Sequence, residues 1–477
     1  MPPILEMQKT AGHQAEELTQ IAAPQVTTYV PSRFNAHSVN EQGHLILYNS
    51  FSGFVAAFPP NAVPRIKGLL SRAGTKAPLN KLGEYLLTKG YIVDSKVDEG
   101  ARFDLRYGSH QYRTDILELI LLASEDCNFR CVYCSQQFKR GSMRPHVREG
   151  IRKLITARIQ KLNAVHISWF GGEPLLGYDA IEELSPYIQK IAQENGVFYQ
   201  SDITTNGYLL TPERSRKMVQ WGIRNYQITL DGTPLEHDSH RVLQEGGPTF
   251  HTILENIVAM KDYPEPFSVA VRVNFDKTNV DKLEPLFKLL KDRLQDDTRF
   301  VMRFRPVEKW GGPNDGTLDT CGLREVHSLW TDLTDQARES GLKAEEVGLS
   351  LNPDGGVCYA ARPFNYIVGA DGKLMKCTVV LDTHPTNVVG EITEDGTFKL
   401  NEDNLAKWVQ PYYKSDKMCN KCFYVPVCQG VCCPLPRILT GERPCPTQKL
   451  QIRETLNFVW NEKQGADNRR LVHISTK

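Results

Sequence analysis

Short apolar runs alternate with longer amphipathic stretches through the middle of the chain. The runs, rich in Val, Ile and Leu, predict buried strands at 116–123, 164–170, 200–205, 225–230, 267–275 and 299–307. The stretches after the first five runs have helical spacing and predict helices at 147–162, 178–195, 211–222, 250–263 and 280–294. Repeated strand-then-helix units indicate a parallel sheet with right-handed crossovers. We therefore expect an α/β fold, a partial (β/α)6 barrel over residues 114–310, with an open doubly wound sheet as the alternative.

The pattern changes on the N-terminal side of this region. Residues 1–34 are rich in Gln, Thr and Pro, show little periodicity, and are expected to form a mobile tail. Residues 35–113 predict two strands joined by a Ser-Gly turn, then two short helices, the second of which runs into a strand at "YIVD". This order is typical of a winged-helix-like module, and a purely structural extension is the alternative.

The pattern also changes on the C-terminal side. Residues 311–357 predict a linker and a helix, and residues 451–477 a final helix and tail. Between them, residues 358–450 have short strands and loops and hold eight of the twelve cysteines. So loop-rich a segment cannot be stabilised by apolar burial alone, which predicts a small metal-binding domain.

Composition and charge exclude several function classes. A net charge of +1 gives no reason to expect a nucleic acid or an anionic membrane as partner. Neither a signal peptide nor a membrane-spanning stretch is evident, so we expect a cytoplasmic protein. Thiols stay reduced in that compartment, and the cysteines therefore indicate metal ligation or redox chemistry rather than disulfides.

Three cysteines follow the first predicted barrel strand, in the sequence "CNFRCVYC": Cys127, Cys131 and Cys134. A 4Fe–4S cluster takes four thiolates, so three on one loop leave one iron open to a substrate or cofactor. A catalytic zinc with an outside ligand is the alternative, since such a zinc also keeps an open position. Chemistry in a parallel barrel collects where strands end, which is where this loop lies.

Other strand ends carry residues suited to a ligand with amino, carboxylate, ribose and adenine groups. Gly171 and Gly172 allow close approach of the backbone to such a ligand, and Glu173 offers a carboxylate to an ammonium. Tyr133, between two of the cysteines, offers an aromatic face to a base. "TTNG", which contains Thr204 and Asn206, offers hydroxyls and amides to a ribose.

The C-x3-C-x2-C spacing followed by "GGEP" resembles the radical S-adenosylmethionine (SAM) enzymes, over residues 114–307. The resemblance implies that Cys127, Cys131 and Cys134 bind a 4Fe–4S cluster whose open iron is chelated by SAM. It further implies that Gly172 and Glu173 hold the SAM amino group and that Tyr133 approaches the adenine. Weaker implied contacts are Thr204, Asn206 and Thr229 on the ribose side and Arg241 at the carboxylate, with loop capping as the alternative.

The C-terminal cysteines resemble the SPASM extension of radical SAM enzymes, which carries two auxiliary 4Fe–4S clusters. The resemblance implies one set of Cys358, Cys377 and Cys432, and a second set of Cys419, Cys422, Cys428 and Cys445. The first set has three members, so its fourth iron is either open or bound by Cys321 or Cys433, of which Cys321 is favoured. A pair of zinc ribbons is the alternative for the whole region.

Within that family the chain resembles maturases of ribosomally made precursor peptides, whose N-terminal winged-helix modules bind the leader as an added strand. This implies an oxidative cross-link, a thioether more than a carbon–carbon bond, and an electron donor such as flavodoxin or ferredoxin. Formylglycine formation, as in anaerobic sulfatase maturases, is one alternative. In those enzymes an aspartate follows the second auxiliary cysteine, whereas Thr378 follows Cys377 here. A non-enzymatic iron–sulfur electron carrier is the other alternative.

Overall fold

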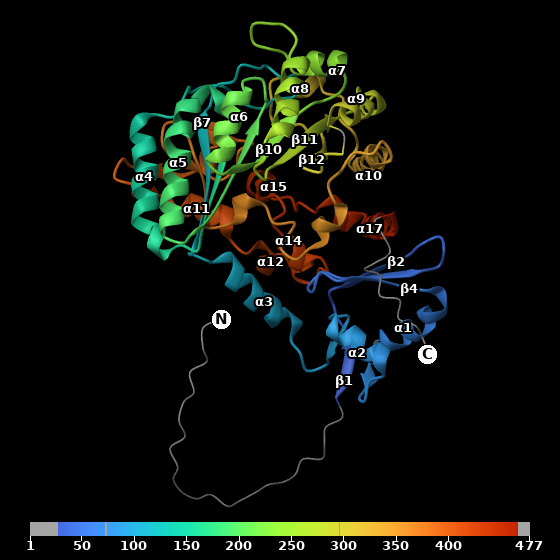
Figure 1. Ribbon diagram of the computed structural model, residues 1–477. Helices are drawn as coiled ribbons and strands as arrows, with labels where there is room; N and C mark the ends of the chain where they lie inside the picture. The colour runs from blue at the N-terminus through green and yellow to red at the C-terminus, as the bar shows by residue number, and fades with distance from the viewer. Residues whose placement is uncertain (1–26, 72–73, 295, 466–477) are drawn as a thin grey trace, which may run out of the picture.

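The computed structural model describes residues 27–71, 74–294 and 296–465 (Figure 1). Its central feature is a row of six parallel strands that are neighbours in chain order, as predicted. These strands are β7 (Ile116–Ser124), β8 (Ala164–Gly171), β9 (Phe198–Thr205), β10 (Ile223–Thr229), β11 (Ser268–Phe275) and β12 (Phe300–Pro306). The strands β7 and β12 are not paired with each other, so the barrel is partial.

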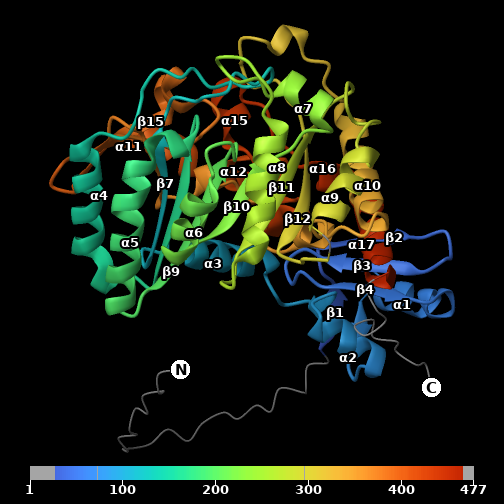
Figure 2. The same cartoon turned by 45° about the horizontal axis from the view of Figure 1, so that its top comes forward.

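Amphipathic helices cover the outer face of this curved sheet (Figures 1 and 2). They are α4 (Pro145–Arg158), α5 (Tyr178–Glu194), α6 (Pro212–Gln220), α7 (Pro234–His240), α8 (Phe250–Ala259) and α9 (Glu284–Leu294). On β8, Val165, Ile167 and Trp169 are fully buried, whereas the alternating residues His166 and Ser168 are half-buried and face the inside of the barrel. The strand and helix predictions for this region are confirmed to within a few residues.

The cysteine-rich region continues the sheet of the barrel. Its first strand, β13 (Asn365–Val368), pairs in parallel with β7. Three antiparallel strands follow, β14 (Lys373–Met375), β15 (Val388–Ile392) and β16 (Phe398–Leu400), and give one sheet of ten strands. The two regions therefore share backbone hydrogen bonds along β7.

Helices fill the remainder of the C-terminal half. The helix α10 (Leu323–Glu339) lies in the predicted linker and packs near β12. The later helices are α11 (Glu402–Val409), α12 (Tyr412–Ser415), α13 (Lys417–Asn420), α14 (Val425–Cys428), α15 (Pro434–Thr440), α16 (Thr447–Leu450) and α17 (Ile452–Gly465). No helix within the described ranges has both the length and the apolar character needed to cross a membrane.

The N-terminal unit contains two small antiparallel sheets and three helices. One sheet has β1 (Thr28–Pro31) between β5 (Thr75–Lys76) and β6 (Ile92–Asp94), and the other has β2 (Asn35–Val39), β3 (Leu45–Asn49) and β4 (Val55–Phe58). The helices are α1 (Val63–Leu69), α2 (Lys81–Thr88) and α3 (Glu99–Gln111). The predicted hairpin is confirmed as β3–β4. The predicted tail is wrong at its C-terminal end, because β1 lies within it, and residues 1–26 lie outside the described residues.

The N-terminal unit shares its core with the cysteine-rich region, beside α17 in both views (Figures 1 and 2). Phe34 and Phe103 form one buried cluster with Tyr413 and Cys419, and the rings of Phe103 and Tyr413 are 4.8 Å apart. In a second cluster, Tyr48 packs with residues of α14 and α17 and donates a hydrogen bond of 2.5 Å to the Leu351 carbonyl. Residues of the N-terminal unit therefore pack directly against the segments that carry the outer cysteines.

We expect Phe103→Ala to destabilise the C-terminal half as well as the N-terminal unit. Truncating a buried Phe typically costs about 3–5 kcal/mol, from lost burial and the cavity left behind. Phe103 is 3% exposed, whereas Leu105 on the same helix is 76% exposed. Urea unfolding should therefore show a clear loss for Phe103→Ala and almost none for Leu105→Ala. Equal midpoints for the two variants would contradict a shared core.

Candidate active site

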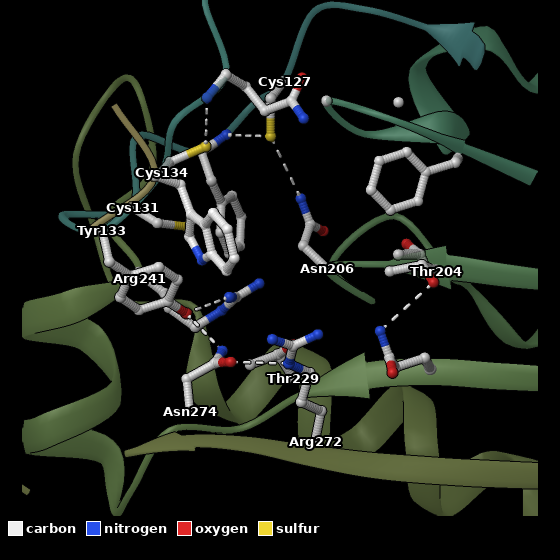
Figure 3. Close-up of a pocket in the computed structure, with 18 of the residues that line it drawn as sticks. Cys127, Cys131, Tyr133, Cys134, Thr204, Asn206, Thr229, Arg241, Arg272 and Asn274 are labelled. Carbon is white, nitrogen blue, oxygen red and sulfur yellow. Dashed lines mark hydrogen bonds between the residues drawn. The ribbon is translucent and has the colours of Figure 1, made fainter. Parts of the chain in front are cut away.

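A cavity of about 250 Å³ opens where the six barrel strands end (Figure 3). Every strand, or the loop that follows it, contributes to its wall. The side chains and backbone that line it include Cys127, Cys131, Tyr133, Cys134, Gly171, Gly172, Thr204, Asn206, Thr229, Arg241, Arg272, Asn274, Glu308 and Trp310. The prediction that one site collects at the carboxyl ends of the strands is consistent with this placement.

The loop of three cysteines forms one side of the cavity. Backbone N–H groups donate to two of the sulfurs, from Phe129 to Cys127 Sγ at 3.3 Å and from Gln136 to Cys134 Sγ at 3.4 Å. The loop is anchored by backbone hydrogen bonds to the end of α7 and the segment after it, from Val132 to the His240 carbonyl at 2.9 Å and from Arg130 to the Val242 carbonyl at 2.8 Å. Such N–H groups around sulfur are one way in which proteins tune iron–sulfur clusters.

Burial keeps these thiols protonated in the absence of a cation. It raises the pKa of Cys127 to about 12 and that of Cys131 to about 11. Thiolates here therefore need a positive charge such as iron ions, and three sulfurs on one cavity wall fit three corners of a cubane. Within the described ranges, no group of three His, Cys, Asp or Glu side chains is arranged to hold a single metal ion.

The glycines of "GGEP" are needed for close approach to the protein backbone, rather than only to a ligand as the sequence suggested. Gly171 has φ +146°, and a Cβ on it would lie 1.9 Å from the Ser124 carbonyl oxygen. A Cβ on Gly172 would lie 2.5 Å from the Asp126 carbonyl oxygen. Both residues also line the cavity. They therefore press the end of β8 against the segment that leads into the cysteine loop.

Glu173 is fully buried and does not itself line the cavity. Its carboxylate accepts hydrogen bonds from Leu175 N at 2.9 Å, Thr205 Oγ1 at 2.7 Å and Asn206 N at 2.7 Å. Burial raises the pKa of this carboxyl, and the hydrogen bonds oppose that effect. Glu173 thus joins the end of β8 to the end of β9, and a contact with the SAM amino group stays a prediction.

Tyr133 is the centre of a buried hydrogen-bond network. Its hydroxyl donates to Asp231 Oδ2. It accepts from Arg241 Nη1 at 2.7 Å and from Asn274 Nδ2 at 3.0 Å (Figure 3). Asp231 is fully buried and also accepts from the Asn274 backbone N–H at 2.8 Å. Asp231 and Asn274 were not predicted as site residues, although Asp231 follows one predicted strand and Asn274 lies near the end of another. The network fixes the tyrosine ring that the resemblance assigns to the adenine.

Two arginines bring positive charge to the cavity. Arg241 lies 3.9 Å from Asp231, and its buried Nε has no hydrogen-bond partner among the described residues. Arg272, which the sequence analysis also missed, donates from Nε to Asn274 Oδ1 at 2.7 Å while burial lowers its pKa. Both guanidinium groups suit carboxylate recognition, and Glu308 lies on the same cavity wall.

The predicted ribose-side residues all line the cavity, in different environments. Asn206 Nδ2 donates to Asn128 Oδ1 at 2.8 Å and lies 3.9 Å from Cys127 Sγ. Thr204 Oγ1 accepts a long hydrogen bond of 3.5 Å from Gln227 Nε2. Thr229 is buried at the end of β10. The structure brings these residues together with the cysteine loop, and their contact with a ribose stays a prediction.

The C-terminal cysteines fall into two neighbourhoods. Burial, together with the nearby thiols of Cys433 and Cys377, raises the pKa of Cys358 to about 12. The pKa of Cys432 is raised by burial and by Cys428, Cys433 and Cys445. Cys419 and Cys422 lie on the side of Cys428, since both thiols raise the pKa of that residue.

Cys321 has other neighbours than the C-terminal cysteines do, and its role as an extra ligand stays a prediction. The neighbours that shift its pKa, after burial, are charged residues that include Asp276, Lys277 and Glu325. The segment that carries it follows β12, and residues 322 and 325 cap the start of α10. Cys433, the residue that was not preferred, lies beside Cys358 and Cys377 instead.

Comparison with known proteins agrees with this site. Residues 121–290 match the model of the Radical SAM superfamily, and this segment holds the cysteine loop and most of the cavity wall. Residues 121–290 therefore form a radical SAM domain, and the chain that carries it is an enzyme.

Two relatives show how far the sequence similarity extends. The chain is 24% identical over 340 residues to a cysteine-type anaerobic sulfatase-maturating enzyme of Clostridium novyi (strain NT), covering 66% of this chain and 87% of the relative. It is 24% identical over 233 residues to the radical SAM cyclopropyl synthase TigE of Paramaledivibacter caminithermalis, covering 43% and 46%.

A solved structure shows the same fold. Native anSMEcpe with bound AdoMet matches with a TM-score of 0.55 and 17% identity, over 73% of this chain and 98% of that one. The same enzyme with bound AdoMet and Cp18Cys peptide matches with a TM-score of 0.53 and 17% identity, over 74% and 98%.

We expect Glu173→Gln to lower both SAM affinity and stability. The glutamine amide has one acceptor oxygen where the carboxylate has two. Its NH2 group would therefore face at least one of the present donors, Leu175 N, Thr205 Oγ1 or Asn206 N. Losing a hydrogen bond to a charged group typically costs about 1.5–3 kcal/mol. Equilibrium dialysis with SAM and thermal melts measure the two effects, with Glu182→Gln on the outer helix α5 as the matched control. Wild-type behaviour of Glu173→Gln in both assays would contradict the role given to this carboxylate.

Proposed function

We propose that this enzyme modifies a ribosomally made precursor peptide by installing an oxidative intrapeptide cross-link, a thioether in preference to a carbon–carbon bond. The observation that supports it most is that the cavity beside the three-cysteine loop adjoins the segment that carries Cys377. Gln136, which follows the loop, donates to the Thr378 carbonyl at 3.2 Å, one residue beyond Cys377. A peptide in the cavity would therefore lie between two sites of redox chemistry.

The residues of the cavity would have different roles. Cys127, Cys131 and Cys134 would hold a 4Fe–4S cluster, and Arg241 and Arg272 would neutralise the carboxylates of SAM or peptide. Tyr133, fixed by Asp231, Arg241 and Asn274, would face the adenine. Bound together, reduced cluster and SAM supply a 5′-deoxyadenosyl radical, with the electron delivered by a donor such as flavodoxin or ferredoxin.

A thioether needs one further oxidation after hydrogen abstraction. The peptide loses a hydrogen atom from carbon to the deoxyadenosyl group and a proton from its cysteine thiol. As the carbon–sulfur bond forms, one electron leaves the peptide. We assign two auxiliary 4Fe–4S clusters to the C-terminal cysteines, and the one beside Cys377 would accept that electron because it lies nearest the cavity.

The N-terminal unit would bind the leader as an added strand on the free edge of β4. In the described part of the chain, β4 pairs with β3 alone. Asn49 N donates to Phe54 O at 3.0 Å, so Asn49 and Phe54 form a hydrogen-bonded pair. Such pairs alternate along an antiparallel ladder with pairs that do not bond to each other. The N–H groups of Val55 and Ala57 belong to the second kind and therefore point away from β3. Outward N–H groups on an edge strand are what strand addition uses.

Formylglycine formation is the second candidate, favoured by the similarity to the sulfatase-maturating enzyme of Clostridium novyi. Thr378 counts against it, because its hydroxyl is not a base and is hydrogen-bonded to the Tyr359 hydroxyl at 2.8 Å. A plain electron carrier is disfavoured for another reason. A carrier has no use for a cavity lined by arginines next to its cluster-binding loop.

Co-expression with the short open reading frame beside the gene, followed by mass spectrometry of the peptide, tests the proposed reaction. We expect a loss of about 2 Da per cross-link, because two hydrogens leave, and one fewer alkylatable thiol. Cys131→Ala should give an unmodified peptide while it retains the iron of the C-terminal clusters. A modified peptide that keeps every free thiol would rule out the thioether, and a formylglycine mass would favour the second candidate.

Ala57→Pro should weaken binding of the leader. Proline removes the outward N–H of Ala57 but spares the hydrogen bonds between β3 and β4, which involve its neighbours. Ala57→Val keeps the N–H and serves as the control. Fluorescence anisotropy should show weaker binding of a leader-bearing peptide to Ala57→Pro alone, with unchanged SAM cleavage. Equal affinity for the two variants would remove β4 from leader recognition.

A further inference from the structure

We propose that the adjacent residues Cys432 and Cys433 serve different clusters, with Cys433 rather than Cys432 completing the set of Cys358 and Cys377. Cys432 then belongs with the outer cysteines Cys419, Cys422, Cys428 and Cys445. This assignment rests on the proposed pair of auxiliary clusters and reverses the roles that the cysteine spacing gave to the two residues.

The backbone separates the two side chains. Cys433 has φ −148° and ψ 110°, an extended conformation that ends where α15 begins at Pro434. Consecutive side chains of an extended segment point to opposite sides. The two thiols therefore face away from each other across the chain, and one cluster cannot use both without a change of backbone.

The side that Cys433 faces is the barrel side. Cys377 belongs to the large core of the barrel, and Cys358 and Cys433 both pack against that core. The backbone N–H of Cys358 donates to the Val431 carbonyl at 3.1 Å, which aligns the segment before the doublet with Cys358.

The side that Cys432 faces is the outer one. Cys428 belongs to the core shared with Tyr48 and α17, and Cys422 and Cys432 pack against that core. Cys432 Sγ donates to the Pro444 carbonyl at 2.8 Å, one residue before Cys445. Packing, hydrogen bonding and backbone conformation therefore all place Cys433 on the barrel side and Cys432 on the outer side.

This division has a consequence for the reaction. The inner set, as assigned, has three thiols, Cys358, Cys377 and Cys433. The outer set has five, one more than a 4Fe–4S cluster needs. The inner cluster therefore keeps one iron for a ligand from outside this set, and a thiolate of the peptide in the neighbouring cavity has the right chemistry.

Iron counts on the full-length chain test the division, in a Cys127→Ala/Cys131→Ala/Cys134→Ala background that removes the SAM cluster. After anaerobic reconstitution the background should hold about eight irons, in two 4Fe–4S clusters. Cys433→Ala should lower this to about four. Adding Cys358→Ala should lower it no further, because both residues serve one cluster. Cys432→Ala should keep about eight, since four outer cysteines remain.

The opposite pattern, loss with Cys432→Ala and retention with Cys433→Ala, would overturn the division. If Cys433→Ala loses all iron through unfolding, Cys433→Ser decides by Mössbauer and EPR spectroscopy. An altered signal from one cluster supports the division, and two unaltered clusters overturn it. A background that holds only about four irons would instead refute the proposed pair of clusters.

Discussion

The cysteine loop is placed by a contact between backbones at the ends of β7 and β8. The Cβ positions of Gly171, Gly172 and Gly177 point at the carbonyl oxygens of Ser124, Asp126 and Ala123, at distances of 2.5 Å or less. Any side chain at these glycines would push the two strand ends apart, and no rotamer change relieves a clash with backbone. The loop that starts at Cys127 can therefore leave β7 in its observed direction only because β8 ends in glycine.

Two further interactions extend this constraint across the site. Glu173 fixes the end of β8 to the end of β9, because its carboxylate accepts hydrogen bonds from Thr205 and Asn206. Arg140 links the end of β7 to the cysteine-rich region. Its guanidinium pairs with Glu125 after β7 at 2.7 Å and with Asp371 and Asp382 beyond β13. The SAM-side loop and the segment around Cys377 are thus held by one ion-pair network in addition to the shared sheet.

The parts of the fold that follow from local patterns could be predicted from the sequence. The alternation of apolar runs with helical spacing specified the barrel strands, and "CNFRCVYC" with "GGEP" specified the cavity. What the sequence could not show depends on pairing between distant segments. The pairing of β13 with β7 joins residues more than 240 positions apart, and Asp231 becomes part of the site through contacts with Tyr133, Arg241 and Asn274 from other segments. The sequence also could not decide between Cys432 and Cys433, because spacing counts residues but does not say which way an extended side chain points.

The shared sheet and the contacts beyond it would suit the proposed oxidation. The strand β7 leads to the cysteine loop at its carboxyl end, and β13, parallel beside it, brings the turn that follows it to the same edge, where Ala370 N donates to Glu125 at 2.9 Å. The strand β14 runs back antiparallel to β13, so strand register alone does not place Cys377. The segment after Cys377 is held at the cysteine loop by the hydrogen bond from Gln136 to the Thr378 carbonyl and by the ion pair of Arg140 with Asp382. In the proposed reaction, a substrate radical made in the cavity would therefore be generated close to the group that would take the next electron.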